Sequence, residues 1–537
     1  AGRPTAARGR GGGVAAPHHL ASRAGIEVLS AGGSAVDAAI AANAVLTVVD
    51  PSAAGLGGDA FWLVWSPRDG RVVGLNGSGR SGSLTPLAGR EGTLMERVGP
   101  ATVTVPGAVR SWLDAHRRFG RLPTERLLAP AISAAQDGFP ASPTFVDDIE
   151  WMHRAATGSA HGSVLDGLLR RHGRPWRPSE IVRLPRLAAT LDRLATAGLA
   201  DFYEGQIAAD LERYFRSISA PIAAGDLTRH TSLWCEPVSA TYRGVELVTT
   251  PPNSSGVTAL EILSILGETE PPAPDEVDTV GWWHRGIEAA KLALADRDAV
   301  LTDPDDLDPT RVASLLSREV ARDRARRIAP YADLDGLPVR ALVGGTAVIV
   351  TADADGSIAV LIQSVASRFG ALLADPVTGV HLHNRGSAFS TDPAHPNALR
   401  PGARVASSLI PLMVLRNGRP WVALATMGGD SQAQLDAQVV SRLVDGRQSP
   451  ESALAAPRWY AVAEEEAGPT RRVRCEPHTP ASLLDGLAGL GHQIESTSAQ
   501  RPWTGRMQCL AVEADGTLLA CTDPRSLDGA PAVALPS

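Results

Sequence analysis

The stretch ALVGGTAVIVTADADGSIAVLIQSVASRFG, from Ala341 to Gly370, contains the pattern that decides the fold. Apolar residues alternate with others from Thr346 to Thr351 and again from Ser357 to Ser364. The segment between these two runs, Ala352 to Gly356, ends in the turn-forming pair Asp-Gly. Alternation with a period of two on both sides of such a turn predicts a β-hairpin.

A hydroxyl residue at the head of this hairpin follows a flexible stretch of backbone. The pair Gly344-Gly345 directly precedes Thr346, and glycine gives the chain conformations that other residues rarely adopt. This arrangement suits a chain that cuts its own peptide bond ahead of Thr346. The cut would leave the threonine with a free amine beside its hydroxyl, so that one residue supplies both nucleophile and base. The alternative is an ordinary hairpin in which threonine only favours β-structure.

The overall composition excludes several classes of partner. The 537 residues carry 51 basic and 58 acidic side chains, a net charge of −7, which provides no basic surface for nucleic acid. No uninterrupted apolar run is long enough to cross a bilayer. The N-terminal sequence AGRPTAARGRGGG lacks the apolar core of a signal peptide. A secreted form whose signal has been removed would look the same.

The cysteines favour a reducing compartment. They are scattered without C-x-x-C spacing, so neither a zinc site nor a disulfide scaffold is predicted, and we expect reduced thiols in the core. We therefore expect a cytoplasmic protein. The four positions are Cys235, Cys475, Cys509 and Cys521.

Two further patterns resemble ligand sites without meeting their requirements. The glycines at 55, 57 and 58 lead into a β-type segment, whereas a dinucleotide-binding loop leads into a helix. His381 and His383 alternate along a predicted strand and would share a face, as a pair of metal ligands does, but no third ligand stands out. The sequence therefore predicts no metal and no cofactor.

Segments along nearly the whole chain resemble the γ-glutamyltransferase (γ-glutamyltranspeptidase) family of N-terminal-nucleophile (Ntn) hydrolases, of which this chain would be a divergent member. The resemblance implies an α/β (α+β) fold, a four-layer αββα sandwich, made as a precursor that cleaves itself between Gly345 and Thr346. A large subunit, 1–345, and a small subunit, 346–537, would remain together as one interlocked body. The segments that carry the resemblance are GGSAVDAAIAANAVLTVVDPSAAGLGGDAFWLVW (Gly32–Trp65), VPGAV (Val105–Val109), RLPTERLLAPAISAAQDGFPAS (Arg121–Ser142), PPNSSG (Pro251–Gly256), EAAKLALADRDAVLTDPD (Glu288–Asp305), LRPGARVASSLIP (Leu399–Pro411) and MGGDS (Met427–Ser431).

The same resemblance implies catalytic roles. Thr346 matches the nucleophile that begins the small subunit. Its free α-amine would have a pKa of about 7.7–8.0, so that part of it is neutral at pH 7 and can accept the hydroxyl proton. Gly428 and Gly429 match the glycines whose backbone N–H groups bind the developing oxyanion. Ser364 falls where the family has a threonine that supports the hydroxyl of the nucleophile.

Substrate-binding roles follow in the same way. Ser407 and Ser408 match the serine pair that binds the carboxylate of the substrate. The family's arginine for the α-carboxylate falls in the segment LNGSGR, where Ser78 occupies the aligned position and Arg80 follows two residues later.

The departures from the family pattern indicate a different acyl group. Ala347 and Val348 follow the nucleophile where the family has threonine and histidine, and Ala366 replaces an asparagine. Arg385 stands in place of a glutamine, and Ala388 in place of the aspartate that binds the glutamyl ammonium. A buried ammonium without a carboxylate partner is strongly unfavourable, whereas a guanidinium suits a carboxylate or a keto acid. The alternative is that Arg385 faces outward and pairs with a surface acid.

These observations predict an autoprocessed hydrolase of an amide-type bond, acting on a small carboxylated substrate that is not a γ-glutamyl compound. Three alternatives remain open. One is a biosynthetic hydrolase of a C–C bond that releases an oxalyl or keto-acid group. The others are an ordinary γ-glutamyl hydrolase or transferase, and a catalytically silent homologue that serves in binding.

Overall fold

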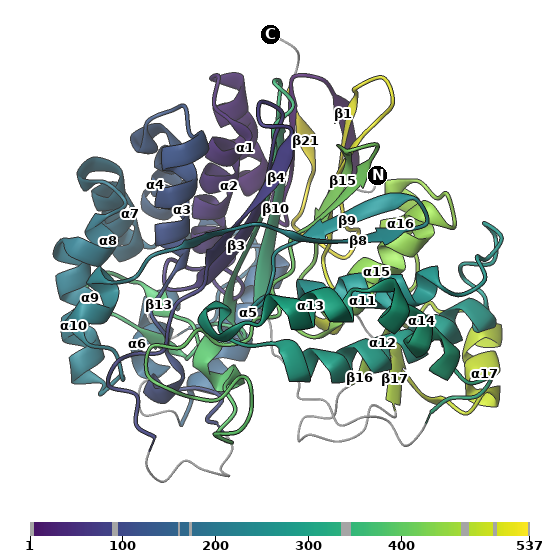
Figure 1. The fold of residues 1–537 in the computed structure, drawn as a ribbon. Coiled ribbons are helices and arrows are strands. Elements are labelled where there is room, and N and C mark those ends of the chain that lie inside the picture. Colours follow the sequence, from purple (N-terminus) through teal and green to yellow (C-terminus); the bar gives the residue numbers. More distant parts are fainter. Residues whose placement is uncertain are drawn as a thin grey trace.

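Two seven-stranded antiparallel sheets lie face to face at the centre of the molecule, with helices on both outer sides (Figure 1). The structure is a computed structural model that describes residues 5–87, 95–158, 162–170, 174–333, 345–462, 472–497 and 502–534. The predicted αββα sandwich is confirmed.

The first sheet is built around the predicted hairpin. Thr346 pairs with Ser364 and Ala352 with Ile358, and every residue of both hairpin strands is buried. The hairpin is therefore confirmed, with strands longer than the sequence pattern indicated. The order of this sheet is β21 (Ala532–Val533), β2 (Gly12–Ala15), β10 (Gly345–Asp353), β11 (Ile358–Ala366), β3 (Asp59–Ser66), β4 (Arg71–Gly77) and β7 (Leu233–Cys235).

The second sheet contains strands from both ends of the chain and from its middle. Its order is β1 (Ala6–Gly9), β20 (Leu518–Thr522), β19 (Gln508–Val512), β15 (Arg419–Ala425), β14 (Leu412–Arg416), β9 (Val245–Thr249) and β8 (Val238–Tyr242).

The alternation within each strand divides the apolar residues between two cores. Along β10, Val348 and Val350 join the cluster between the two sheets, whereas Ala347 and Ile349 face the first helical layer. Both faces of the hairpin are thus covered by apolar side chains, so its apolar runs are nearly continuous and do not show the strict alternation that we expected from the sequence.

Each sheet is covered by its own set of helices. On the first sheet, α1, α2 and α3 pack directly on the strands, and α4 and α7 pack outside them. On the second sheet, α11 and α15 lie on the strands and α12 and α14 cover α11 (Figure 1). The helices are α1 (His19–Ser30), α2 (Ala35–Val49), α3 (Ala108–Phe119), α4 (Thr124–Gln136), α5 (Pro143–Ala156), α6 (Gly162–Leu169), α7 (Pro185–Ala197), α8 (Asp201–Glu204), α9 (Gln206–Ser217), α10 (Ala224–Thr228), α11 (Gly256–Gly267), α12 (Val280–Val300), α13 (Pro309–Leu315), α14 (Arg318–Arg327), α15 (Ser431–Val444), α16 (Pro450–Ala455) and α17 (Ala481–Gly489).

Short elements complete the fold. Small sheets are formed by β5 with β6, by β12 with β13, and by β16, β17 and β18. Their bounds, followed by those of the 3-10 helices, are β5 (Phe139–Pro140), β6 (Ile181–Val182), β12 (Leu373–Ala374), β13 (His381–Leu382), β16 (Trp459–Val462), β17 (Arg472–Cys475), β18 (Gln493–Ser496), η1 (Pro100–Thr102), η2 (Pro304–Asp306), η3 (Arg385–Ala388) and η4 (Pro502–Thr504).

Both sheets contain strands from before and from after residue 345, and these pair with one another. In the first sheet, β2 lies between β21 and β10, and β3 pairs with β11. In the second sheet, β9 pairs with β14, and β1 pairs with β20. Backbone hydrogen bonds therefore join the two parts of the chain along several independent edges.

Two expectations about compartment have structural counterparts. None of the described helices is both long enough and apolar enough to span a membrane. All four cysteines are free thiols, and three of them are buried.

Candidate active site

Three polar side chains stand in a row across the middle strands of the first sheet. Thr346 on β10 pairs with Ser364 on β11, and Ser364 pairs in turn with Asp59 on β3. Because side chains alternate along a strand, all three share the face whose next inward residues, Val348, Ile362 and Phe61, pack between the sheets. The row therefore lies at one end of the core between the two sheets.

Thr346 is buried, and its hydroxyl forms no hydrogen bond to the described residues. Its side chain is 3% exposed, and its Oγ1 has no hydrogen-bond partner among the described residues. The strand register shifts between Gly345 and Thr346. The hydroxyl of Thr346 therefore has no competing hydrogen bond within the described part of the chain.

Ser364 holds the carbonyl in front of Thr346. Its Oγ donates to the carbonyl oxygen of Gly345 at 2.5 Å and accepts from the backbone N–H of Ala366 at 2.8 Å. The resemblance implied that Ser364 supports the hydroxyl of Thr346, and in the uncut chain it does not. A serine hydroxyl has one proton to donate, and the intact peptide places the Gly345 oxygen where that proton is directed.

Arg385 faces this site and not the solvent. It begins η3, is 2% exposed, and donates from a terminal nitrogen to Ser364 Oγ at 3.0 Å. Its Nε has no hydrogen-bond partner, and no described carboxylate forms an ion pair with it. Burial lowers the pKa of Arg385, and the nearby charge of Asp59 opposes that shift. The guanidinium is thus a buried cation that donates to Ser364 but has no carboxylate in contact with it among the described residues.

Asp59 belongs to the site but was missed by sequence reasoning. Its Oδ1 accepts from the backbone N–H of Gly79 at 2.9 Å, and its Oδ2 lies 3.5 Å from His383 Nδ1 without a hydrogen bond. Burial raises the pKa of Asp59, with His383 and Arg385 opposing. The available signal was an acidic residue at the head of the strand DAFWLVWS, which is otherwise almost entirely apolar.

The turn of Gly428 and Gly429 connects β15 to α15 near the same peptide. Their φ angles are 137° and 64°, and neither N–H has a backbone or side-chain acceptor in the part of the chain that the structure describes. A cavity of about 80 Å³ is lined by both Gly345 and Met427, the residue before the turn. Met427 and Gly345 therefore border one space, and the Gly428-Gly429 turn follows Met427 directly in the chain.

The predicted serines lie on neighbouring segments. Ser407 forms a parallel bridge with Ser254, and the adjacent Ser408 has a buried Oγ without a partner. Ser78 is fully buried and donates from Oγ to Asn76 Oδ1 at 2.7 Å. Of these serines, Ser408 retains an uncommitted hydroxyl.

Arg80 is already neutralised. Its guanidinium donates to Asp305 Oδ2 at 2.7 Å, to Asp303 Oδ2 at 3.2 Å and to the carbonyl of Gly402 at 2.8 Å. Of the two predicted substrate-binding arginines, only Arg385 is left without a contact carboxylate among the described residues.

A possible metal group lies elsewhere and is occupied by an ammonium. His284, Glu288 and His492 present ligand atoms within 4.8 Å of one another. However, Lys291 Nζ donates to Glu288 Oε1 at 2.7 Å and to the carbonyl of Asp333 at 3.0 Å. A cation thus already neutralises the carboxylate that would bind an ion.

His381 and His383, for which the sequence predicted no metal site, do not belong to this ligand group. His383 Nε2 lies 3.0 Å from Thr104 Oγ1, and the Nε2 of His381 is buried without a partner. Within the described ranges, the group containing His284 is the one set of three or more such ligands, and it includes neither residue.

The buried His492 predicts a loss of stability in acid. Burial lowers its pKa to about 3, and Lys291 and His284 add to the shift. The unfolded chain binds this proton below pH 6.5 and the folded chain does not, so the free energy of unfolding should fall as pH decreases from 6.5 towards 3. His492→Gln should reduce this slope by up to about 1.4 kcal/mol per pH unit, measured by urea unfolding at a series of pH values. A slope in His492→Gln equal to that of the wild type would contradict the assignment to burial.

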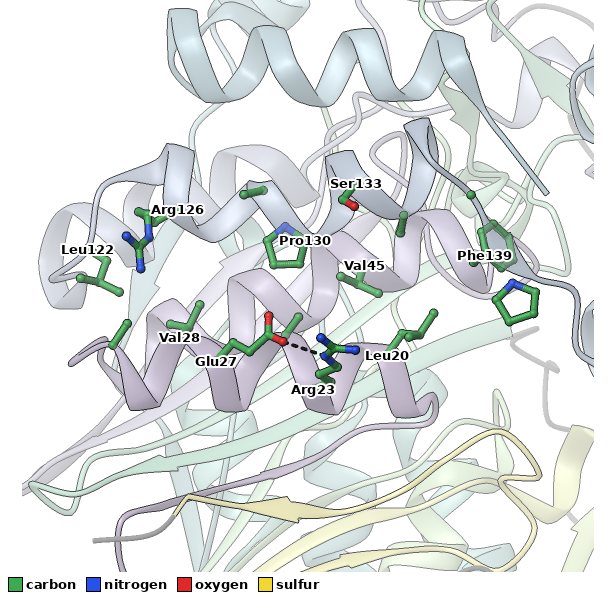
Figure 2. A pocket seen from close by; sticks show the side chains of 16 residues that line it. Leu20, Arg23, Glu27, Val28, Val45, Leu122, Arg126, Pro130, Ser133 and Phe139 are labelled. Carbon is green, nitrogen blue, oxygen red and sulfur yellow. Dashed lines mark hydrogen bonds and ion pairs between the residues drawn. The ribbon is translucent and has the colours of Figure 1, made fainter. Parts of the chain in front are cut away.

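A larger groove is not part of this site. A hollow of about 520 Å³ lies between α1 and α4 and is lined mainly by aliphatic side chains. Figure 2 shows these side chains. The charged residues of the hollow include Arg23 and Glu27, which pair with each other at 2.7 Å. This groove lies in the outer helical layers and contains none of the residues around Thr346.

Comparisons with known proteins agree along the whole chain. A model of the family described as gamma-glutamyltranspeptidase matches residues 21–533. The glutathione hydrolase-like YwrD proenzyme of Bacillus subtilis is 35% identical over 532 residues, covering 96% of this chain and 97% of the relative. The oxamate amidohydrolase proenzyme of Klebsiella pneumoniae is 33% identical, covering 95% and 96%. The crystal structure of cephalosporin acylase from Bacillus halodurans has a TM-score of 0.90 at 34% identity, covering 99% and 97%.

Proposed function

This chain belongs to the gamma-glutamyltranspeptidase family, and we propose that it is an N-terminal threonine hydrolase of a carboxylated acyl group other than γ-glutamyl. It would cut an amide-type bond after cleaving its own chain between Gly345 and Thr346. Residues 1–345 and 346–537 would remain together as its two subunits.

The observation that carries this proposal is the buried charge of Arg385. Its guanidinium donates to Ser364 and has no contact carboxylate among the described residues. An isolated buried charge is strongly unfavourable, so a ligand anion at this position would be bound tightly. A planar guanidinium binds a carboxylate with two parallel hydrogen bonds. The name of the oxamate amidohydrolase supports the proposal, because oxamate carries a carboxylate directly beside its amide carbon.

The proposed reaction proceeds through an acyl-enzyme. The free amine of Thr346 accepts the proton of its own hydroxyl as the oxygen attacks the substrate carbonyl. Gly428 and Gly429 donate backbone N–H groups to the oxyanion that forms. Water then releases the acyl group. In this scheme Arg385 and the uncommitted hydroxyl of Ser408 hold the carboxylate of the acyl group.

The remaining predicted residues would shape the pocket. Ser407 would fix the segment that presents Ser408, and Ser78 would fix the segment beside Asp59. We expect Arg80 to act indirectly, because its donors are taken by acidic residues and a carbonyl.

A matched substrate panel tests the proposal. Cut enzyme is assayed with oxamate and with succinyl, glutaryl, acetyl and γ-glutamyl anilides. At least one carboxylated acyl compound should be cleaved with a kcat/KM about a hundredfold above that of the acetyl anilide, the value of one charged hydrogen-bonded contact. The acetyl compound serves as the control because it has the same anilide but no carboxylate. Brisk turnover of the γ-glutamyl anilide would contradict the proposed acyl group.

One observation favours γ-glutamyl hydrolysis or transfer as a second candidate. Asp59 Oδ2 has no hydrogen-bond partner and is placed to accept from a ligand ammonium. Against this, Asp59 lies near the buried guanidinium of Arg385, whose positive charge would repel a ligand ammonium. Adding a 2,4-diketo acid to the panel tests the C–C hydrolase alternative, because the same nucleophile can attack a ketone.

A further inference from the structure

A chain of hydrogen bonds runs from Arg385 to the peptide bond that would be cut. The guanidinium donates to Ser364 Oγ at 3.0 Å, and Ser364 Oγ donates to the Gly345 carbonyl oxygen at 2.5 Å. Ser364 Oγ also accepts from the N–H of Ala366. A serine oxygen has two lone pairs, so these two donors occupy both, and the single serine proton is left to point at Gly345.

We propose that Arg385 is a positioning residue for the self-cleavage of the chain, acting through Ser364 before it binds any substrate. The inference rests on the proposed function in one respect, which is that Thr346 attacks the carbonyl of Gly345. It extends that function by giving Arg385 a role in the maturation of the enzyme as well as in binding the substrate.

The step balances without any added reagent except water. Thr346 Oγ1 forms a bond to the carbonyl carbon of Gly345, and the carbonyl π electrons move to the oxygen as an oxyanion. The oxyanion collapses, the C–N bond breaks, and the proton lost from Oγ1 ends on the Thr346 nitrogen, which leaves an ester. Water then hydrolyses the ester, giving a Gly345 carboxylate and restoring the Thr346 hydroxyl beside a free amine.

The guanidinium matters because negative charge develops on the oxygen that Ser364 contacts. The proton of Ser364 is donated to that oxyanion, and the cation behind it polarises the hydroxyl in the same direction. Preorganised donors of this kind act most strongly in a buried site, and Ser364 and Arg385 are both almost fully buried. A neutral side chain at position 385 would hold Ser364 less firmly and polarise it less.

The product of the cut would be the first anion to meet Arg385. The Gly345 carboxylate forms from the oxygen that Ser364 already contacts, one hydrogen bond away from the guanidinium. Self-cleavage and substrate hydrolysis would thus use the same polar contacts in succession.

Self-cleavage of freshly synthesised chains tests the inference without any substrate. The full chain is made by cell-free translation, and the uncut and cut forms are followed by denaturing electrophoresis. Arg385→Gln should slow cleavage about tenfold to hundredfold, the range for a charged hydrogen bond. Arg385→Lys should retain part of the rate, and Ser364→Ala should slow cleavage about a hundredfold. The matched control is Arg442→Lys, at a buried arginine of α15 that pairs with Asp278; it should cut at the normal rate.

Two readouts separate positioning from a merely structural effect. Methylguanidinium should accelerate the cleavage of Arg385→Ala, because it restores a guanidinium to the vacated space. Hydroxylamine cleaves the ester intermediate, and it should not restore Arg385→Gln, because that variant is slowed before the ester forms.

The inference is overturned if folded Arg385→Gln cuts at the wild-type rate, or if hydroxylamine restores it fully. Lack of rescue by methylguanidinium in a folded Arg385→Ala chain would also count against it. If Thr346→Ala is still cut at this bond, the proposed nucleophile is wrong instead. The two failures are therefore distinguishable.

Discussion

A Thr346→Ala chain is expected to remain a single polypeptide of 56.1 kDa and to lose turnover. Alanine removes the only atom proposed to attack, both in the cut and in the reaction with substrate. Losing the nucleophile of a hydrolase lowers kcat by about a millionfold, which places turnover at background. Denaturing electrophoresis and intact-mass measurement report the cut, and release of aniline reports turnover.

Thr346→Ser is the matched control, because serine retains the hydroxyl and should cut itself and hydrolyse substrate at reduced rates. A Thr346→Ala chain that still separates into 1–345 and 346–537 would place the nucleophile elsewhere. A wild-type chain that stays whole on ageing and hydrolyses no member of the panel would instead support a silent binding homologue.

Gly428→Ala is expected to lower kcat by about a hundredfold to a thousandfold, the effect of losing an oxyanion donor. The φ of Gly428 is 137°, a region that other residues rarely adopt. A Cβ at this position would lie 2.2 Å from Ser431 Oγ, and Ser431 Oγ is fixed by hydrogen bonds to the carbonyls of Gly428 and Trp503. The turn must therefore shift, and its N–H groups would move with it. The variant should still cut itself, because Ser364 contacts the Gly345 carbonyl in the uncut chain.

The control is Gly418→Ala in the β14–β15 turn, where φ is also positive at 73° but a Cβ would meet no atom within 4 Å. This variant also places a side chain at a positive φ, away from the site, and should keep its kcat. Adding Ser431→Ala to Gly428→Ala removes the clash but not the strain, so activity should return only in part. Equal loss in Gly418→Ala and Gly428→Ala would contradict the role of the turn.

The central hairpin of the fold was predictable from the sequence because its signals lie within one short segment. Alternating apolar residues, an Asp-Gly turn and a Gly-Gly entry define β10 and β11 without reference to the rest of the chain. The four layers could be assigned only through resemblance, since strand order depends on pairings between distant segments. The pairing of β3 with β11, for example, joins residues about three hundred positions apart.

The resemblance suggests which residues form the site, but it does not give their contacts. The position of Arg385 could not be decided from sequence, because burial depends on η3 folding back towards β11. The hydrogen bond from Ser364 to the carbonyl of Gly345 was not visible in the sequence, because it depends on the pairing of β10 with β11. The partners of Arg80 lie more than two hundred residues away, so the neutralisation of its charge was not visible.

Asp59 shows what a motif search omits. It sits beside a glycine cluster that was weighed only as a phosphate-binding loop and rejected on that ground. Burying an acidic residue at the start of an apolar strand is unfavourable in free energy unless other groups interact with its carboxylate. For Asp59 these groups include His383 and Arg385, which come from a distant segment. The unfavourable free energy of burying this carboxylate was therefore the signal in the sequence that Asp59 has a special role.

Because strands from either side of residue 345 pair in both sheets, the two fragments of one molecule would stay together after the cut. Separating the fragments would require breaking the ladders between β2 and β10, β3 and β11, and β9 and β14 together, which amounts to unfolding. Fragments from different molecules would then not trade places in solution. In a mixture of differently tagged active and inactive enzyme, no large subunit of one form would be found with a small subunit of the other. Each enzyme molecule would keep the two fragments of its own precursor chain.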